Sequence, residues 1–134
     1  MSPPRSLPEA DERTRRVLSP VALKASRKIG EIWGLAPAEI AALLGLTTAQ
    51  YEEAVKSPQD VLLAPEQFDR AGLLIAIFRA LGNLLDQPAA DRWPRQPNRA
   101  SLFGGRTAME LMQAGGVESM KDVLRYLRAV GQGL

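Results

Sequence analysis

The sequence predicts an all-α protein, and three observations support this prediction. Apolar residues recur at three- and four-residue steps along much of the 134-residue chain, which is the spacing of one helix face. Three predicted helices begin with a proline, in the pairs Ser19–Pro20, Ala36–Pro37 and Ala64–Pro65. Proline lacks a backbone N–H, and at the first position of a helix that N–H would have no partner within the helix. No stretch shows the apolar–polar alternation that is typical of a half-buried strand.

The composition excludes several classes of chemistry. The chain contains no His and no Cys, so it has no thiol nucleophile, no disulfide and no Cys/His zinc site. The side chain that most often acts as a general base is also missing. Carboxylates do not gather in any predicted loop. We therefore expect a protein that is not an enzyme and that binds no metal and no cofactor.

Charge and hydropathy give little indication of a partner. The formal net charge of +2 is too small to demonstrate a polyanionic ligand, and an aromatic fraction of 5% is low for a protein that stacks on bases. The longest apolar run, Ala71–Phe78, is far below the ~18 residues that cross a bilayer. The first residues lack the basic start and apolar run of a signal peptide. We expect a cytoplasmic protein that does not enter a membrane.

The first eighteen residues (1–18) are predicted to form a flexible basic arm. They combine three prolines with Arg13, Arg15 and Arg16, a composition that buries little surface. A solvated tail and a segment that lies along nucleic acid phosphates are both open interpretations. After the arm, the apolar spacing predicts an amphipathic helix over Pro20–Trp33, which ends at Gly34.

Residues 37–56 have the pattern of a helix-turn-helix. A short helix is predicted over Pro37–Leu44 and a second one over Thr47–Lys56, with a tight turn at Gly45–Leu46 between them. Ala41 lies four residues before the turn glycine, and its small side chain lets the two helices approach each other. The unit is similar to the helix-turn-helix of Xre-type bacterial regulators.

Two interpretations of the second helix remain open. Residues that would contact operator DNA are Thr47, Thr48, Gln50 and Lys56, and phosphate contacts would come from Lys24, Arg27 and Lys28 on the preceding helix. Against this, Glu52 and Glu53 place carboxylates close to where phosphates would pass. The alternative is a helix-turn-helix that serves as a scaffold without strong DNA affinity.

The longest predicted helix covers Pro65–Asp86 and is apolar on more than one face. A helix of this kind must be buried on more than one side. One solution is a homodimer, with an interface that includes Phe68, Leu74, Ile75, Phe78 and Leu81. The other is a central core helix in a monomer.

A glycine turn precedes the last two predicted helices. Gly104–Gly105 permits positive φ angles, so we expect Leu102 and Phe103 to be presented on a tight turn. Thr107 and Glu110 then have the spacing of a capping box, in which each side chain satisfies the other residue's backbone N–H. The helices are predicted over Thr107–Ala114 and Glu118–Val130, separated by Gly115–Gly116.

The order of motifs in the second half resembles the toxin-binding domain of Xre/MbcA/ParS-type antitoxins. The residues that carry this resemblance are Trp93, Pro97–Asn98, Leu102–Phe103, Gly104–Gly105, Thr107, Glu110–Leu111–Met112, Gly115–Gly116 and the Leu-rich final helix. Together with the helix-turn-helix before it, the resemblance covers Ser19 to the C-terminus. One departure is Ala108, where family members often have proline.

The resemblance implies a type II antitoxin that neutralises a RES-domain toxin, which degrades NAD or transfers its ADP-ribose. It implies an Xre-like helix-turn-helix region at 19–62, a toxin-binding and dimerisation domain at 63–134, occlusion of the toxin's NAD pocket and repression of the antitoxin's own operon. The implied toxin contacts are Leu102, Phe103, Gly104, Gly105, Arg106, Arg128, Gly131, Gln132, Gly133 and Leu134. The alternative is a DNA-binding regulator with a helical dimerisation domain and no toxin partner.

Overall fold

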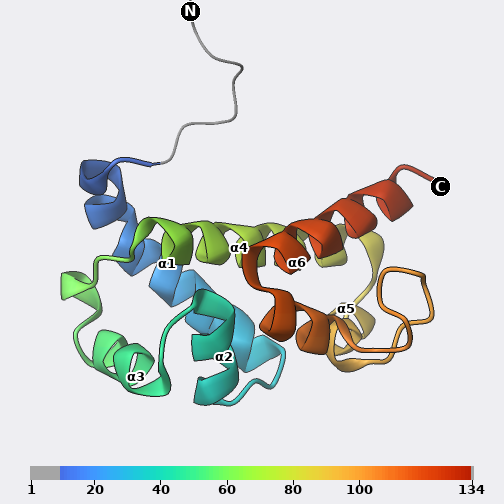
Figure 1. Cartoon of the computed structure of the whole chain (residues 1–134), viewed down its shortest axis with the longest axis horizontal. Helices are drawn as coiled ribbons and strands as arrows, with labels where there is room; N and C mark the ends of the chain where they lie inside the picture. Colours follow the sequence, from blue (N-terminus) through green and yellow to red (C-terminus); the bar gives the residue numbers. More distant parts are fainter. Residues whose placement is uncertain (1–9, 134) are drawn as a thin grey trace, which may run out of the picture.

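The computed structural model describes residues 10–133, and all regular structure in that range is helical (Figure 1). The helices are α1 (Glu12–Ile32), α2 (Pro37–Leu44), α3 (Thr48–Lys56), α4 (Pro65–Leu84), α5 (Ala89–Arg92) and α6 (Ala108–Gly131), with short 3₁₀ turns η1 (Pro58–Asp60) and η2 (Trp93–Arg95). The all-α prediction is confirmed. No helix among these residues is long and apolar enough to span a bilayer.

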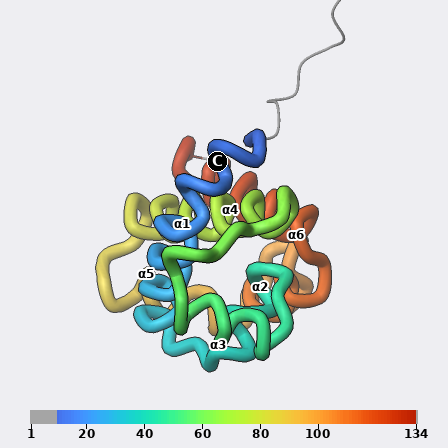
Figure 2. Tube along the Cα trace, turned by 90° about the vertical axis from the view of Figure 1, so that its left-hand side faces the viewer, coloured from blue at the N-terminus to red at the C-terminus, as the bar shows by residue number. Residues whose placement is uncertain are grey.

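Helix α4 is the central element of the fold. It packs against α1, α2 and α6, and Figures 1 and 2 show α1 and the second half of α6 crossing it from different sides. Four of its side chains are almost completely buried: Ala71, Leu74, Ile77 and Leu81. The two-faced apolar pattern of this helix is therefore explained in large part by the chain's own core.

Helix α1 begins earlier than the sequence pattern predicts. It starts at Glu12 rather than at Pro20, and Asp11 caps it by accepting a hydrogen bond of 2.7 Å from the N–H of Thr14. Pro20 lies inside the helix. The expected arm at 1–18 is thus wrong for residues 12–18, while residues 1–9 lie outside the described part of the chain.

Contacts from a distant segment explain why the helix extends through this proline-containing region. The buried hydroxyl of Ser19 accepts a hydrogen bond of 3.0 Å from the N–H of Leu63, and the Arg15 guanidinium donates one of 2.9 Å to the Leu63 carbonyl. Both backbone groups of a buried residue are satisfied by side chains of α1. These bonds hold the first turns of α1 against the segment that leads into α4, and they depend on residues far apart in sequence.

Helices α2 and α3 form the predicted helix-turn-helix. The turn between them is made by Gly45 in the left-handed region (φ 74°), and the N–H of Leu46 donates to the carbonyl of Ala41 at 2.9 Å. Thr47 caps α3, as its spacing predicts. The unit is tied to the second half of the chain by an ion pair of 3.1 Å between Glu39 on α2 and Arg95 in η2.

Helix α6 is divided by a sharp kink at Gly116, which has φ 61° and ψ −142°. The predicted break at Gly115–Gly116 is therefore confirmed. The guanidinium of Arg70 on α4 lies between this kink and the helix-turn-helix: a Cβ atom on Gly116 would be 2.9 Å from its Nη2, and one on Gly45 would be 3.0 Å from its Nε. Its Nη1 donates to the Ala42 carbonyl at 3.5 Å. Arg70 therefore joins the two halves of the chain at a position that no sequence pattern indicates.

Candidate partner-binding surfaces

The four residues predicted to contact DNA are exposed, three of them on α3 and the fourth, Thr47, at its N-cap. Two of them also hold the helix start, because Thr47 Oγ1 accepts from the Gln50 N–H at 3.0 Å and Gln50 Oε1 accepts from the Thr47 N–H at 2.9 Å. Thr48 and Lys56 are exposed at the two ends of the helix. The structure thus brings the predicted set onto one helix, and it gives the Gln50 carbonyl oxygen a structural role.

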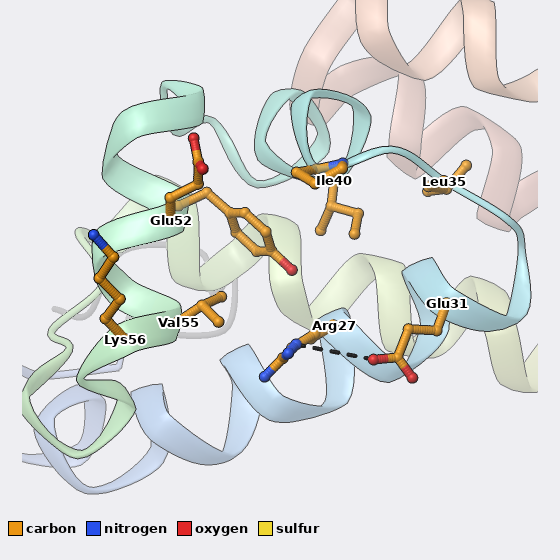
Figure 3. Close-up of a pocket in the computed structure, with 9 residues that line it drawn as sticks. Arg27, Glu31, Leu35, Ile40, Glu52, Val55 and Lys56 are labelled. Atoms are coloured by element: carbon orange, nitrogen blue, oxygen red, sulfur yellow. Dashed lines mark ion pairs between the residues drawn. The ribbon is translucent and has the colours of Figure 1, made fainter.

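A groove of about 390 Å³ separates α3 from α1 (Figure 3). Its apolar lining includes Ile40 and Val55, and its charged lining consists of Arg27 and Glu31 from α1 with Glu52 and Lys56 from α3. Arg27 and Glu31 form an ion pair of 3.9 Å, shown by the dashed line in Figure 3. The two cations favour a phosphate at this edge, whereas the two carboxylates oppose it.

Tyr51 also lines this groove and is almost fully buried. Burial raises the pKa of its phenol, an effect that the nearby Arg27 charge partly offsets. The phenol is therefore neutral at physiological pH.

The segment that leads into α6 is a closed loop. Pro97 and Thr107 form an isolated antiparallel bridge, the N–H of Asn98 donates to the Arg106 carbonyl at 3.0 Å, and the N–H of Gly105 donates to the Asn98 carbonyl at 2.9 Å. Gly104 and Gly105 take the positive φ angles of 57° and 85° that the glycine pair predicts. The loop is held at its base and presents its tip to solvent.

Phe103 is buried, which corrects the expectation that it is presented on the surface of this turn. It is 0% exposed, and its ring makes edge-to-face contacts with Trp93 at 5.6 Å and Tyr126 at 5.1 Å between ring centroids. Tyr126 comes from the far half of α6, so the burial of Phe103 depends on a contact that local spacing does not reveal. Phe103 anchors the loop to the core and is not available to a partner.

The remaining loop residues are accessible. Gly104, Gly105 and Arg106 are exposed, and Leu102 is half-buried. Thr107 and Glu110 form the predicted capping box, in which each side-chain oxygen accepts from the other residue's N–H at 3.0 Å. These hydrogen bonds lower the pKa of Glu110, with the Thr107 backbone N–H as the main cause. Because the folded pKa is lowered, this contribution to stability is present at neutral pH and is lost as the pH falls through that pKa.

The end of α6 leads into an exposed tail. Arg128, Gly131, Gln132 and Gly133 are all accessible, and the helix stops when Gln132 takes the capping position. Leu134 lies outside the described residues. In Figure 1 this tail and the loop at 97–107 lie toward the same end of the molecule, opposite the start of α1. The predicted toxin contacts on the loop and on the tail therefore lie at one end.

Two of the five residues predicted to form a dimer interface are not available for one. Leu74 and Leu81 are each 1% exposed, because α4 lies between α1 and α6. Phe68, Ile75 and Phe78 are half-buried, and Phe78 packs on Trp33 with a ring centroid distance of 6.3 Å. The predicted interface is therefore wrong for Leu74 and Leu81. Homodimer formation itself stays a prediction.

Two family models match the chain in the order that the fold suggests. The antitoxin Xre-like helix-turn-helix domain matches residues 12–76, which contain α1 to α3 and part of α4. The antitoxin Xre/MbcA/ParS C-terminal toxin-binding domain matches residues 74–133, which contain the rest of α4, the closed loop and α6. No curated protein matches the chain.

The two matches meet within α4 and together cover residues 12–133, so nearly all of the described structure is accounted for. They confirm the resemblance that the motif order indicates. The domain boundary expected between residues 62 and 63 stays a prediction. With an Xre-like helix-turn-helix followed directly by the C-terminal toxin-binding domain, the chain belongs to the Xre/MbcA/ParS-type antitoxins.

Proposed function

We propose that this antitoxin neutralises a RES-domain toxin, one that degrades NAD or transfers its ADP-ribose, by binding it directly and obstructing its NAD pocket. The observation that carries the proposal is the exposed tail at the end of the matched toxin-binding domain, where Gln132 and Gly133 follow Gly131, the last residue of the well-anchored helix α6. A narrow, glycine-rich segment on a rigid support fits a small-molecule pocket.

Electrostatics supplies the physical basis of this obstruction. NAD contains a pyrophosphate, so a pocket that binds it must offer cations or hydrogen-bond donors. The side-chain carbonyl of the exposed Gln132 and the backbone carbonyls of the tail are acceptors for such donors. The closed loop at 97–107 lies toward the same end of the molecule, and its exposed Arg106 provides a second point of contact outside the pocket.

Removal of Gly131–Leu134 is expected to abolish protection from the toxin while the rest of the antitoxin stays folded. The deleted residues follow the last buried contact of α6 at Leu127, so the core is unaffected. The measurements are the growth and the NAD content of cells that co-express toxin and antitoxin, together with circular dichroism of the purified variant. A variant that lacks residues 2–9 is the control and should protect fully.

The result that contradicts obstruction is full protection by the truncated chain. In that case, binding outside the tail would be sufficient for inhibition, and the membership of the antitoxin family would be unaffected. If the truncated chain no longer co-purifies with the toxin, the tail contributes to the affinity of the complex as well as obstructing the pocket.

We also propose that the antitoxin represses its own operon through α3. In support, Lys24, Arg27 and Lys28 are exposed on α1, and Arg27 borders the same groove as Lys56. Lys24 and Arg27 thus lie beside the C-terminal end of α3, where Lys56 adds a further positive charge. The alternative function, a regulator without a toxin partner, differs in one observable: it binds the promoter but no product of a neighbouring gene.

Reversal of two of these charges, Lys24→Glu with Lys28→Glu, is expected to weaken promoter binding and to flatten its salt dependence. Removal of one phosphate contact lowers the magnitude of the slope of log K against log salt by about 0.9. The measurement is fluorescence anisotropy with labelled promoter DNA over a salt series. A matched variant, Arg79→Glu with Arg92→Glu, changes the charge equally on other helices and should bind as the wild type does. An unchanged slope in the first variant would favour the scaffold interpretation.

A further inference from the structure

A second charged surface lies on α6, away from the helix-turn-helix. The second half of this helix and the adjoining edge of α4 enclose a shallow groove of about 330 Å³, which we name the cationic groove. Its apolar part consists of Leu73 from α4 and Leu124 from α6. Its charged part consists of Lys121, Arg125 and Arg128, which follow one another at one-turn steps along α6. None of its lining residues is acidic.

The cations of this groove are available to a partner. Lys121 pairs with Glu118 at 3.9 Å and Arg125 with Asp122 at 3.2 Å, in both cases one turn back on the same helix. The Lys121 and Arg125 side chains are 51% and 72% exposed. Exposed pairs of this kind contribute little to stability, so a partner's carboxylate can replace the local one at little cost. Arg128 is exposed and has no ion pair within the described residues.

The position of the groove connects it with the toxin-binding domain. Four of its five lining residues belong to the segment that matches that domain, and Leu73 directly precedes it. Arg128 lies three residues before Gly131, where the exposed tail begins. A partner that holds the tail would therefore lie beside the end of this groove.

We propose that the cationic groove binds an acidic segment of the toxin, an inference that rests on the proposed function. Lys121 and Arg128 are two turns apart, or about 10 Å along the helix axis. The fitting segment carries two or three carboxylates over that span and one apolar side chain that reaches Leu73 and Leu124. The cations supply orientation and a fast encounter, and the apolar contact supplies part of the binding energy.

The surrounding charges favour a protein over a nucleic acid as the occupant. Glu118 and Asp122 border the same face of α6, and their carboxylates would repel a continuous row of phosphates. A protein segment can place its own cations against these two residues. Promoter contacts are therefore assigned to α1 and α3, and the cationic groove to the toxin.

The test reverses two charges of the groove, Lys121→Glu with Arg125→Glu, and leaves Arg128 and the tail intact. The matched control, Arg79→Glu with Arg92→Glu, makes the same change in net charge on exposed residues of α4 and α5. Affinity for the purified toxin is measured by calorimetry at low and high salt, and circular dichroism verifies folding. We expect the groove variant to bind about tenfold or more weakly at low salt, with a reduced dependence on salt.

Each other result has a defined meaning. Wild-type affinity in the groove variant, or an equal reduction of affinity in the control, would overturn the inference and leave the proposed function intact. Failure of the wild-type chain to bind the toxin would instead count against the proposed function. If the groove variant keeps toxin affinity but loses promoter affinity, the occupant is DNA and the inference is wrong. A neutral variant, Lys121→Gln with Arg125→Gln, guards against a folding defect caused by charge reversal and should lose a smaller part of the affinity.

Discussion

Replacement of Phe103 by alanine is expected to lower the free energy of unfolding by about 3–5 kcal/mol, the range for a fully buried aromatic side chain. Phe103 is completely buried, and its ring meets Trp93 and Tyr126 edge to face. The substitution removes both aromatic contacts and leaves a cavity between the closed loop and α6. The measurement is chemical denaturation followed by circular dichroism.

Phe103→Leu is the matched comparison for this prediction. It keeps most of the apolar volume and loses the edge-to-face geometry, so its cost should be much smaller. Under conditions where both variants stay folded, toxin affinity should change little. A stable Phe103→Ala variant with strongly weakened toxin binding would show that the residue is a surface anchor after all, contrary to its burial.

Replacement of Gly116 by alanine is expected to destabilise the protein by about 1–3 kcal/mol, the cost of holding a side chain in a conformation that is essentially restricted to glycine. Its φ of 61° and ψ of −142° produce the kink in α6. The added Cβ would also lie 2.9 Å from Nη2 of Arg70, so the guanidinium would have to move. The thermal midpoint should fall accordingly.

Gly72→Ala is the control, because it makes the same chemical change and is expected to raise the thermal midpoint instead of lowering it. Gly72 lies within α4, is exposed, and has no atom within 4 Å of its potential Cβ. Alanine at such a helical position stabilises by roughly 0.5–1 kcal/mol. If both substitutions raise the midpoint, the kink at Gly116 is not required by the fold.

Local signals predict much of this fold. The starts of α2, α3, α4 and α6 agree with the sequence pattern to within a residue, because proline or a capping box marks each of them. The break at Gly116 is likewise visible from the glycine pair. These features depend on a few neighbouring residues, which a sequence displays directly.

The failures have a common cause in long-range contacts. The sequence pattern places the start of α1 too late, because a proline such as Pro20 usually lies in the first turn of a helix. The helix extends further because Ser19 and Arg15 form hydrogen bonds with Leu63, which is distant in sequence. The glycine turn, which suggests that Phe103 is exposed, is visible in the neighbouring residues. The contact between the rings of Phe103 and Tyr126 joins residues far apart in sequence and is not visible there. The burial of Leu74 and Leu81 follows from the placement of α1 and α6 around α4.

The shared use of α4 has a consequence for the evolution of this antitoxin. The two matched segments meet within this helix at residues 74–76, and the same helix packs on α1, α2 and α6. A recombination that exchanged one segment for that of a relative would have to preserve the packing of α4 against both halves. Arg70 adds a further constraint, because it lies against glycines of both halves. Changes in partner preference are therefore expected to arise by surface substitution, on α6 for example, rather than by exchange of whole domains.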